Sequence, residues 1–346
     1  KMEIVTLYFK DEKLYLIDQR KLPNTYEIFE CENYRDVDFA IKDMVVRGAP
    51  AIGASAAYGV VLGAKEYKDL DKDEFLKKME EVLNVLNESR PTAVNLMWGI
   101  KRMRKVIDQN KALSPEEIYV ELKKEADLIA KEDVEINKAM AKHGNTLVPQ
   151  KATILTHCNA GALATVGYGT ALGVVREAFY TGKDIFVYAD ETRPRLQGAK
   201  LTSWELLKEG IPSRLIPDNV AATLIRDGKI DLILVGADRV ASNGDTANKI
   251  GTFMLSVVAK TYGVPFYIVA PTSTIDFEIE TGKEIVIEER DEKEVTHIGG
   301  IRIAPEGVKV YNPAFDVTPN ENIIAIVTEK GVVKPPFKEN LLKIRP

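Results

Sequence analysis

The pattern of apolar and polar positions divides the chain into two regions of different periodicity. Near the N-terminus, residues 3–9 and 13–18 are short apolar runs joined by residues 10–12, which predicts two strands and a turn. From about residue 35 to residue 142 the spacing becomes helical, as it is in the apolar positions of residues 73–86. We therefore expect the first region to be mostly helical, with a few strands before the helices.

A long helix is predicted to close this first region. Ser114 stands where an N-cap is expected, Pro115 occupies the first helical position, and Glu117 completes a capping box. The helix would run to about His143, since Gly144 supplies a stop. Because this segment is rich in charge, we expect it to lie on the surface and to link two parts of the molecule.

After residue 149 short apolar runs alternate with helical segments. The runs that predict strands are residues 152–157, 185–189, 213–216, 232–236 and 265–270. The helices expected between them end near residues 180, 209, 227 and 262, and the first begins after residue 161. Buried strands that alternate with helices are typical of a parallel sheet with helices on both faces.

The expected fold class is therefore α/β. A Rossmann-like parallel-sheet domain would follow a smaller, mostly helical N-terminal domain with a few strands. The length of 346 residues is typical of about two domains, and the predicted division is 1–144 for the strand-plus-helix domain and 145–346 for the Rossmann-like domain.

Charge and composition exclude several classes of function. The chain has 47 basic and 52 acidic residues, so its net charge of −5 argues against a nucleic-acid or membrane-surface binder, although one pocket can still be positive. Neither a signal peptide nor a membrane span is expected, which predicts a soluble cytoplasmic protein. The two cysteines and three histidines lack the spacing of a disulfide framework or a metal motif.

Three predicted strand ends carry reactive side chains, at residues 157–159, 190–193 and 236–239. Ligands of parallel sheets bind beyond the carboxyl ends of the strands, so these segments are candidates for one site. A helix N-terminus at residues 159–161 would lower the pKa of the Cys158 thiol. The alternatives are an inert buried cysteine and an aspartate that caps a helix. His157 is expected to be structural rather than catalytic.

Four further segments bring basic or amide side chains to predicted element ends. Arg47 precedes Gly48, Ala49 and a proline that suits a helix start, which predicts an anion site, whereas the small residues at 53–59 favour tight helix packing. Arg90 lies at a second loop-to-helix junction.

The other two segments lie in the second region. Residues 193–199 contribute two arginines and Gln197, and residues 243–251 are expected to be a polar loop that carries Asn248 and Lys249. Capping and solvated charge remain alternatives for these stretches. A local positive pocket without a glycine-rich nucleotide loop favours a small phosphorylated metabolite over a dinucleotide or a nucleoside triphosphate.

Together these motifs resemble the methylthioribose-1-phosphate isomerase family, which acts in methionine salvage and is related to the alpha, beta and delta subunits of initiation factor 2B. The resemblance rests on residues 47–53, 89–96, 157–161, 190–198, 236–239 and 248–251. They occur in the family's order and cover most of the chain from residue 47 to about 270.

The resemblance implies an aldose–ketose isomerase that converts 5-methylthioribose 1-phosphate to 5-methylthioribulose 1-phosphate. Asp238 would be the general acid for the ring oxygen, provided that an apolar pocket keeps it protonated. Cys158 would either carry a proton from C2 to C1 or stabilise a direct hydride shift. The resemblance further implies a homodimer without a metal or organic cofactor. Its substrate-binding residues would be Arg47, Gly48, Ala49, Arg90, Gln197, Asn248 and Lys249.

Two alternative functions exist within the same wider family, which includes ribose 1,5-bisphosphate isomerases and non-catalytic regulatory subunits. The Cys158 and Asp238 pair resembles the catalytic members rather than the regulatory subunits. The Arg47 and Arg90 motifs resemble the methylthioribose enzyme rather than the ribose bisphosphate enzyme.

Overall fold

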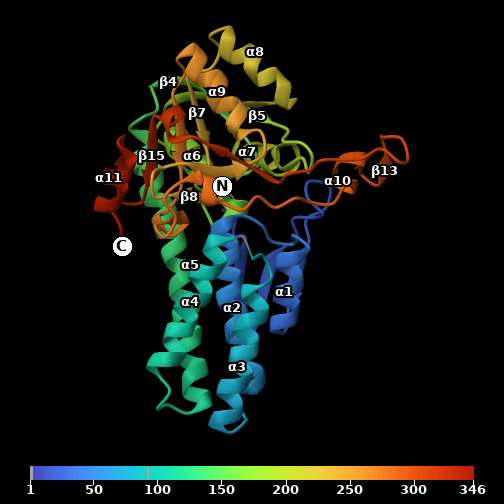
Figure 1. Cartoon of the computed structure of the whole chain (residues 1–346), viewed down its shortest axis with the longest axis vertical. Helices are drawn as coiled ribbons and strands as arrows, with labels where there is room; N and C mark the ends of the chain where they lie inside the picture. The colour runs from blue at the N-terminus through green and yellow to red at the C-terminus, as the bar shows by residue number, and fades with distance from the viewer. Residues whose placement is uncertain (1–2, 92) are drawn as a thin grey trace. The chain divides into compact units, whose positions relative to one another are not determined.

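The computed structural model describes residues 3–91 and 93–346, so Thr92 of the Arg90 motif lies outside the described residues. The described residues form two compact units (Figure 1). The first falls within Lys1–Ala139 and Gly161–Gly173, and the second comprises Met140–Ala160 and Val174–Pro346. The predicted domain division at residue 144 stays a prediction.

The first unit begins with a small antiparallel sheet. Strands β1 (Leu7–Lys10) and β2 (Lys13–Ile17) form the predicted hairpin, and β3 (Ile28–Cys31), which was not predicted, pairs with β2. Asp11 and Glu12 turn the chain with φ of 50° and 58°. The first strand is shorter than the apolar run because its pairing starts only at Leu7.

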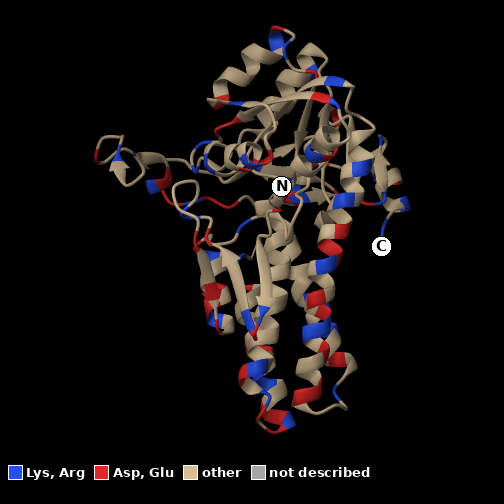
Figure 2. Cartoon of the chain, turned by 180° about the vertical axis from the view of Figure 1, so that it is seen from behind, with Lys and Arg blue, Asp and Glu red and all other residues tan. Residues whose placement is uncertain are grey.

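Helices complete the first unit. They are α1 (Tyr34–Lys42), α2 (Ala49–Tyr67), α3 (Lys72–Asn87), α4 (Val94–Gln109) and α5 (Pro115–Asn145). Of these, α1, α3 and α4 pack against α2 (Figure 1), and α5 contributes its residues up to Ala139. The helix expected at residues 73–86 is α3, and its apolar stripe from Phe75 to Leu86 is buried in the core of this unit. Figure 2 shows basic and acidic side chains interspersed along the outer helix faces.

Glycines of α2 allow its neighbours to approach closely. A Cβ on Gly53 would lie 2.9 Å from the Asn95 carbonyl oxygen of α4, and one on Gly99 would lie 2.8 Å from the Gly53 carbonyl oxygen. A Cβ on Gly59 would meet the Leu86 side chain of α3 at 2.9 Å. The interpretation of residues 53–59 as a helix-packing stripe is therefore confirmed.

The start of α5 has the predicted capping box. Ser114 Oγ accepts a hydrogen bond from the Glu117 amide at 3.2 Å, and Glu117 Oε1 accepts one from the Ser114 amide at 3.4 Å. The helix continues to Asn145, two residues past the expected end. One face of it, which includes Ile118 and Leu122, is buried in the core, so the expectation of a surface helix holds only for the opposite face.

The second unit is built on a seven-stranded sheet with the order β16-β15-β10-β7-β4-β5-β6. Its strands are β4 (Lys151–Thr156), β5 (Asp184–Asp190), β6 (Ser213–Ile216), β7 (Leu232–Val235), β10 (Phe266–Val269), β15 (Ala325–Thr328) and β16 (Gly331–Val333). All pairings are parallel except that of the edge strand β16. Chain order runs outward from β4 to β6 and then outward from β7 to β15, so it reverses between β4 and β7. The prediction of a Rossmann-like sheet is confirmed.

Helices cover this sheet. They are α6 (Ala171–Tyr180), α7 (Ser203–Glu209), α8 (Ala221–Arg226), α9 (Thr252–Tyr262) and α11 (Phe337–Lys343). Single turns of 3-10 helix occur at Ala162–Ala164, Asp218–Val220, Thr272–Thr274, Gly282–Glu284 and Asn320–Asn322, and a π-helical turn spans Gly198–Thr202.

The prediction that a helix begins directly after residue 161 is wrong, because α6 begins only at Ala171. Residues 161–170 form a compact loop in which Gly169, with φ of 88°, packs on the backbone of Gly161. The Thr165 hydroxyl shares its one proton between the Ala162 and Gly167 carbonyls, at 3.2 Å and 3.0 Å, and accepts from the Gly169 amide. These local side-chain bonds compete with helix formation.

The prediction that residues 243–251 form a polar loop is also wrong. Strands β8 (Arg239–Ala241) and β9 (Thr246–Lys249) form a hairpin there, which β11 (Ile275–Asp276) and β14 (Phe315–Thr318) extend to four strands. The apolar periodicity does not reveal β9, because its residues are mostly polar. They form a strand by pairing with β14, which lies about 70 residues away in the chain.

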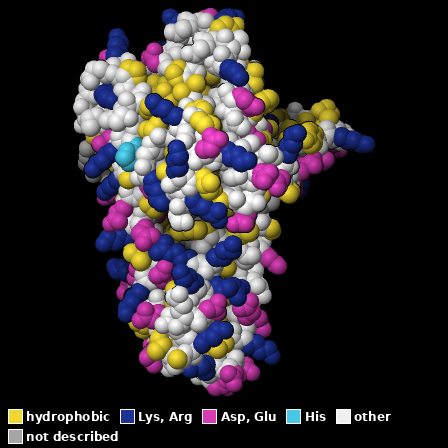
Figure 3. Space-filling view, turned by 60° about the vertical axis from the view of Figure 1, so that its left-hand side comes forward, with side chains coloured by type: hydrophobic (Ala, Val, Ile, Leu, Met, Phe, Trp, Pro, Cys, Tyr) yellow, Lys and Arg dark blue, Asp and Glu magenta, His cyan; other side chains and the backbone are white. Residues whose placement is uncertain are grey.

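An arm projects from the second unit (Figure 1). It consists of α10 (Lys293–Thr296), β12 (His297–Ile298) and β13 (Ile301–Arg302). On the face seen in Figure 3, basic and acidic side chains are interspersed rather than gathered into one field. Within the described ranges, no helix combines the length and apolarity that a membrane span requires.

Candidate functional site

The three strand ends that were singled out follow neighbouring strands. Cys158 comes directly after β4, residues 190–193 after β5, and Asp238 after β7, in the sheet order β7-β4-β5. Cys158 and Asp238 thus flank the point where strand order reverses, which is where open parallel sheets bind their ligands. The expectation that these segments converge is confirmed for the strands that carry them.

The backbone of Cys158 is held in an unusual conformation. Its φ is 61°, in the left-handed region that non-glycine residues rarely adopt, and the residue is 8% exposed. The Cys158 amide donates to Thr192 Oγ1 at 2.8 Å, and its carbonyl accepts from Thr202 Oγ1 at 2.6 Å. Conformations of this kind persist where the surroundings enforce them, often at functional sites.

The proposed electrostatic effect on Cys158 needs a correction. No α-helix begins at residues 159–161: only the single 3-10 turn at Ala162–Ala164 follows Gly161, and α6 starts at Ala171. The α-helix dipole expected beside Cys158 is therefore absent there. The Cys158 turn is fixed instead by hydroxyl groups from the β5–α7 segment.

A buried polar network holds the next residue. Asn159 Nδ2 donates to Glu205 Oε2 at 2.8 Å, and the other Glu205 carboxylate oxygen accepts from Arg176 at 2.7 Å. All three side chains are buried. Since breaking a buried ion pair is costly, this network makes the turn after Cys158 rigid.

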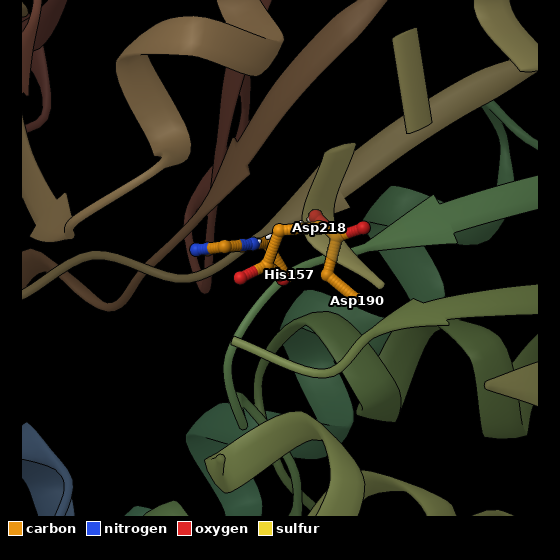
Figure 4. Close-up of side chains that lie close together, drawn as sticks. All are labelled: His157, Asp190 and Asp218. Atoms are coloured by element: carbon orange, nitrogen blue, oxygen red, sulfur yellow. Dashed lines mark hydrogen bonds and ion pairs between the residues drawn. The ribbon is translucent and has the colours of Figure 1, made fainter. Parts of the chain in front are cut away.

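His157 lies in a second network, with Asp190 and Asp218 (Figure 4). His157 Nδ1 is 2.7 Å from Asp190 Oδ2, and Nε2 is 2.7 Å from the Ile250 carbonyl oxygen. A carbonyl only accepts, so Nε2 carries a proton. Burial lowers the pKa of His157, but the hydrogen bond to the Asp190 carboxylate, its negative charge and the bond to the Ile250 carbonyl together outweigh burial, so the net shift is upward. Burial raises the pKa of Asp190 to about 6.

These three side chains have the spacing of a metal site, with ligand atoms within 4.8 Å of one another. Their hydrogen bonds explain the cluster. The two carboxylate oxygens of Asp218 accept from the amides of Thr192 and Arg193, each at 2.7 Å, and His157 uses both of its ring nitrogens. The arrangement thus functions as a brace for the residue 190–193 loop.

Two of the predicted substrate-binding residues lie at the end of β9. Asn248 Nδ2 donates to Thr252 Oγ1 at 3.1 Å, and Lys249 Nζ lies 4.6 Å from the centre of the Phe315 ring. Both are buried in a strand rather than exposed on a loop, and Lys249 is only 8% exposed. A lysine this buried is unusual unless it serves a partner or a ligand.

Gln197 precedes the π-helical turn in the loop after β5. Its side chain is buried, and its Oε1 has no hydrogen-bond partner among the described residues. A buried amide oxygen without a donor is costly, so a ligand hydroxyl there would be favourable.

The side chains of Arg193 and Arg195 do not line an open positive pocket as expected, because both have protein partners. Arg195 pairs with Glu294 at 2.6 Å, and Arg193 donates to the Val295 carbonyl.

In the first unit, Gly48 caps the N-terminus of α2 and Arg47 is half-buried just before it. Gly48 has φ of 93°, and a Cβ there would lie 2.5 Å from Ala164 Cα, so only glycine fits. Ala49 is the first residue of α2, and the predicted helix start is confirmed. Arg90 is half-buried and lies just before α4.

The two helix starts are neighbours, because α2 and α4 contact each other at Gly53 and Asn95. Amides of an N-terminal helical turn, combined with nearby arginines, are suited to anion binding.

Several residues that organise these segments were missed from the sequence. Asp218 follows β6, so the rule applied to the other strand ends could have found it. Asp316 accepts from the amides of Gly251 and Phe253, but it lies in β14, a strand for which the pattern provided no signal. Thr202 carries no signal beyond its residue type, whereas Thr192 lies within the strand end at residues 190–193 that was singled out.

The comparisons with known proteins bear on this arrangement. The model of the initiation factor 2 subunit family matches residues 45–335. The chain belongs to this family. Within the family, a Thermoanaerobacter sp. (strain X514) protein named methylthioribose-1-phosphate isomerase is 73% identical over 99% of each chain.

Two solved structures are similar over nearly the full length. The 5-methylthioribose 1-phosphate isomerase from Pyrococcus horikoshii OT3 has a TM-score of 0.92 and 48% identity, covering 99% of this chain and 96% of that one. A structure from A. fulgidus described as subunit delta of translation initiation factor eIF-2B has a TM-score of 0.86 and 46% identity, covering 98% of each.

Proposed function

We propose that this protein is an aldose–ketose isomerase that converts 5-methylthioribose 1-phosphate to 5-methylthioribulose 1-phosphate in methionine salvage. The observation that carries the proposal is the position of Cys158 and Asp238 directly after β4 and β7, on the two strands that flank the reversal of strand order. The identity of 73% to a protein of that name supports the choice of substrate.

In the proposed reaction Asp238 is the general acid that protonates the ring oxygen as the sugar ring opens. Asp238 is half-buried, and its amide is bonded to the Ala247 carbonyl at 2.9 Å, which fixes its backbone. Hydrogen then moves from C2 to C1. Either the Cys158 thiolate removes the C2 proton and returns it to C1, or hydride shifts directly while Cys158 stabilises the transition state. No net oxidation occurs, so the proposed reaction needs no redox cofactor.

We assign substrate binding to two sets of residues. Gln197, with its unpartnered amide oxygen, would accept a hydrogen bond from a sugar hydroxyl, and the buried Asn248 and Lys249 would supply donors. Arg47 and Arg90, together with the helix start at Gly48 and Ala49, would bind phosphate.

The decisive test is an activity assay with purified protein on 5-methylthioribose 1-phosphate. We expect turnover with the wild type, and a loss on the order of a thousandfold in kcat for Cys158→Ser and for Asp238→Asn, as for other groups that act directly on reacting atoms. Full activity of both variants would refute the assignment of these residues. Deuterium from solvent at C1 would indicate proton transfer, and its absence would indicate hydride shift.

A second candidate function is that of a non-catalytic regulatory subunit. The specific observation in its favour is the similarity to the A. fulgidus protein described as an initiation factor subunit. The same assay separates the two, because a regulatory subunit would turn over neither 5-methylthioribose 1-phosphate nor ribose 1,5-bisphosphate. Faster turnover of the bisphosphate would instead identify the third possibility, an isomerase of that sugar.

We further propose that the protein is a cytoplasmic homodimer.

A further inference from the structure

The buried His157 ring contacts two segments that are distant in sequence. One is the end of β5, through Nδ1 and Asp190, and the other is the turn after β9, through Nε2 and the Ile250 carbonyl. His157 is the residue before Cys158, and Ile250 is the residue after Lys249. A single imidazole therefore joins the backbone of the Cys158 turn to the backbone of the Asn248–Lys249 strand end.

The turn at Ile250 is shaped around this ring. Gly251 has φ of 103°, and a Cβ there would lie 2.8 Å from both Cε1 and Nε2 of His157. The amide of Gly251 is fixed at 2.8 Å by Asp316, and the amide of Ile250 by the Ala314 carbonyl at 3.0 Å. The carbonyl of Ile250 thus has one fixed direction, toward Nε2.

We infer that His157 is a positioning residue, whose Nε2–H bond to Ile250 holds the Cys158 turn in register with Asn248 and Lys249. Cys158 adopts a left-handed backbone that its own residue type disfavours, so the turn needs such external ties. The bond to Asp190 sets the orientation of the ring, and the bond to Ile250 sets the distance between the two segments. The activity consequences of this inference rest on the proposed function.

Two substitutions separate the two hydrogen bonds. His157→Gln places an amide nitrogen near the position of Nε2 and can keep the bond to Ile250, whereas His157→Asn places one near Nδ1 and can keep only the bond to Asp190. We expect His157→Gln to retain kcat/KM within about threefold and His157→Asn to lose on the order of tenfold or more, because small misplacements of reacting groups are costly. Asp190→Asn keeps the Ile250 bond and should behave like His157→Gln.

A second readout does not depend on any substrate. This readout is the rate at which iodoacetamide alkylates Cys158. Peptide mass spectrometry measures this rate separately from that of the other cysteine, the fully buried Cys31. We expect several-fold faster alkylation in His157→Asn, because its turn is released, and wild-type rates in His157→Gln and Asp190→Asn. His143→Asn, which replaces a half-buried histidine near the end of α5, is the matched control and should match the wild type in both readouts.

Equal alkylation rates and equal kcat/KM in His157→Asn and His157→Gln would overturn the inference. If His157→Asn does not fold, the other two variants still test the inference. Alkylation of Cys158 that is faster in His157→Gln or Asp190→Asn than in the wild type would overturn the inference. A wild type that isomerises neither sugar would refute the proposed function alone, since the alkylation rates still decide whether His157 positions Cys158.

Discussion

At the scale of single residues, the loop that follows β5 depends on a backbone approach that only glycine permits. A Cβ on Gly198 would lie 1.6 Å from the Asp190 carbonyl oxygen and 2.8 Å from its carbonyl carbon. The amide of Ala199 also bonds back to the Glu191 carbonyl at 3.3 Å. Because the obstacle is backbone rather than a flexible side chain, the loop that carries Gln197 has no alternative packing.

We expect Gly198→Ala to lower the free energy of unfolding by about 3 kcal/mol or more, since the loop must move away from β5. Urea denaturation followed by circular dichroism measures this. Gly182→Ala is the control, because Gly182 has open space around it and loses only about 1–2 kcal/mol through its φ of 87°. Equal losses in the two variants would show that the Gly198 contact has no special cost.

Buried titratable groups act at the same scale. Asp133 of α5 accepts from the Val166 amide at 2.8 Å and from Asn137 Nδ2 at 3.1 Å, and burial raises its pKa to about 7. The raised pKa means that the folded protein prefers the neutral acid. The contribution of Asp133 to the free energy of unfolding is therefore largest below the ordinary aspartate pKa of about 4. This contribution is lost as the pH rises through 7.

Asp133→Asn removes this titration while keeping an oxygen that can accept from Val166. We expect the melting temperature of the variant, relative to that of the wild type, to rise between pH 5 and pH 8. Differential scanning calorimetry at the two pH values tests this. A constant difference between variant and wild type would mean that Asp133 does not titrate in this range.

At the scale of elements, the start of α5 illustrates how much local sequence can determine. The capping box of Ser114 and Glu117 satisfies two backbone amides that the helix itself leaves without partners. Both residues are close in sequence, so their interaction needs no information from the rest of the fold. The helix that they begin supplies Asp133 and Asn137 to the first unit.

Ser114→Ala should lower the free energy of unfolding by about 1 kcal/mol, the usual cost of losing an N-cap. Chemical denaturation gives the value. Glu117→Ala removes the reciprocal bond, and the double variant should lose less than the sum of the single changes because the two bonds form one unit. Strict additivity would contradict the capping box as a cooperative feature.

At the scale of the whole molecule, the chain is proposed to form a homodimer. Apolar side chains of α9 remain partly exposed, with Phe253 at 43% and Met254 at 45%, and Ile301 of the arm is 71% exposed. Exposed apolar groups of this size are available for association.

Light scattering after size-exclusion chromatography is expected to yield about twice the chain mass of 38.5 kDa. The measurement should be repeated over a tenfold dilution, because a stable dimer keeps its mass while a weak one dissociates. A mass equal to that of one chain at all concentrations would refute the homodimer.

The sequence by itself determined the fold class and the segments that could carry chemistry. Apolar periodicity separates helices from buried strands because it reflects which face of each element is buried, and this is a local property. The residues after three of the strands were identified in the same way. The choice of Cys158 and Asp238 among them came from the family resemblance.

Only the tertiary structure decided which strand ends are neighbours and how each side chain is held. The adjacency of β4 and β7 depends on parallel pairing across about 80 residues, which no local pattern encodes. Non-local pairing with β14 likewise makes the segment of Asn248 and Lys249 a strand. The bond from His157 to Ile250 joins residues 93 positions apart, so its role became visible only when the fold brought them together.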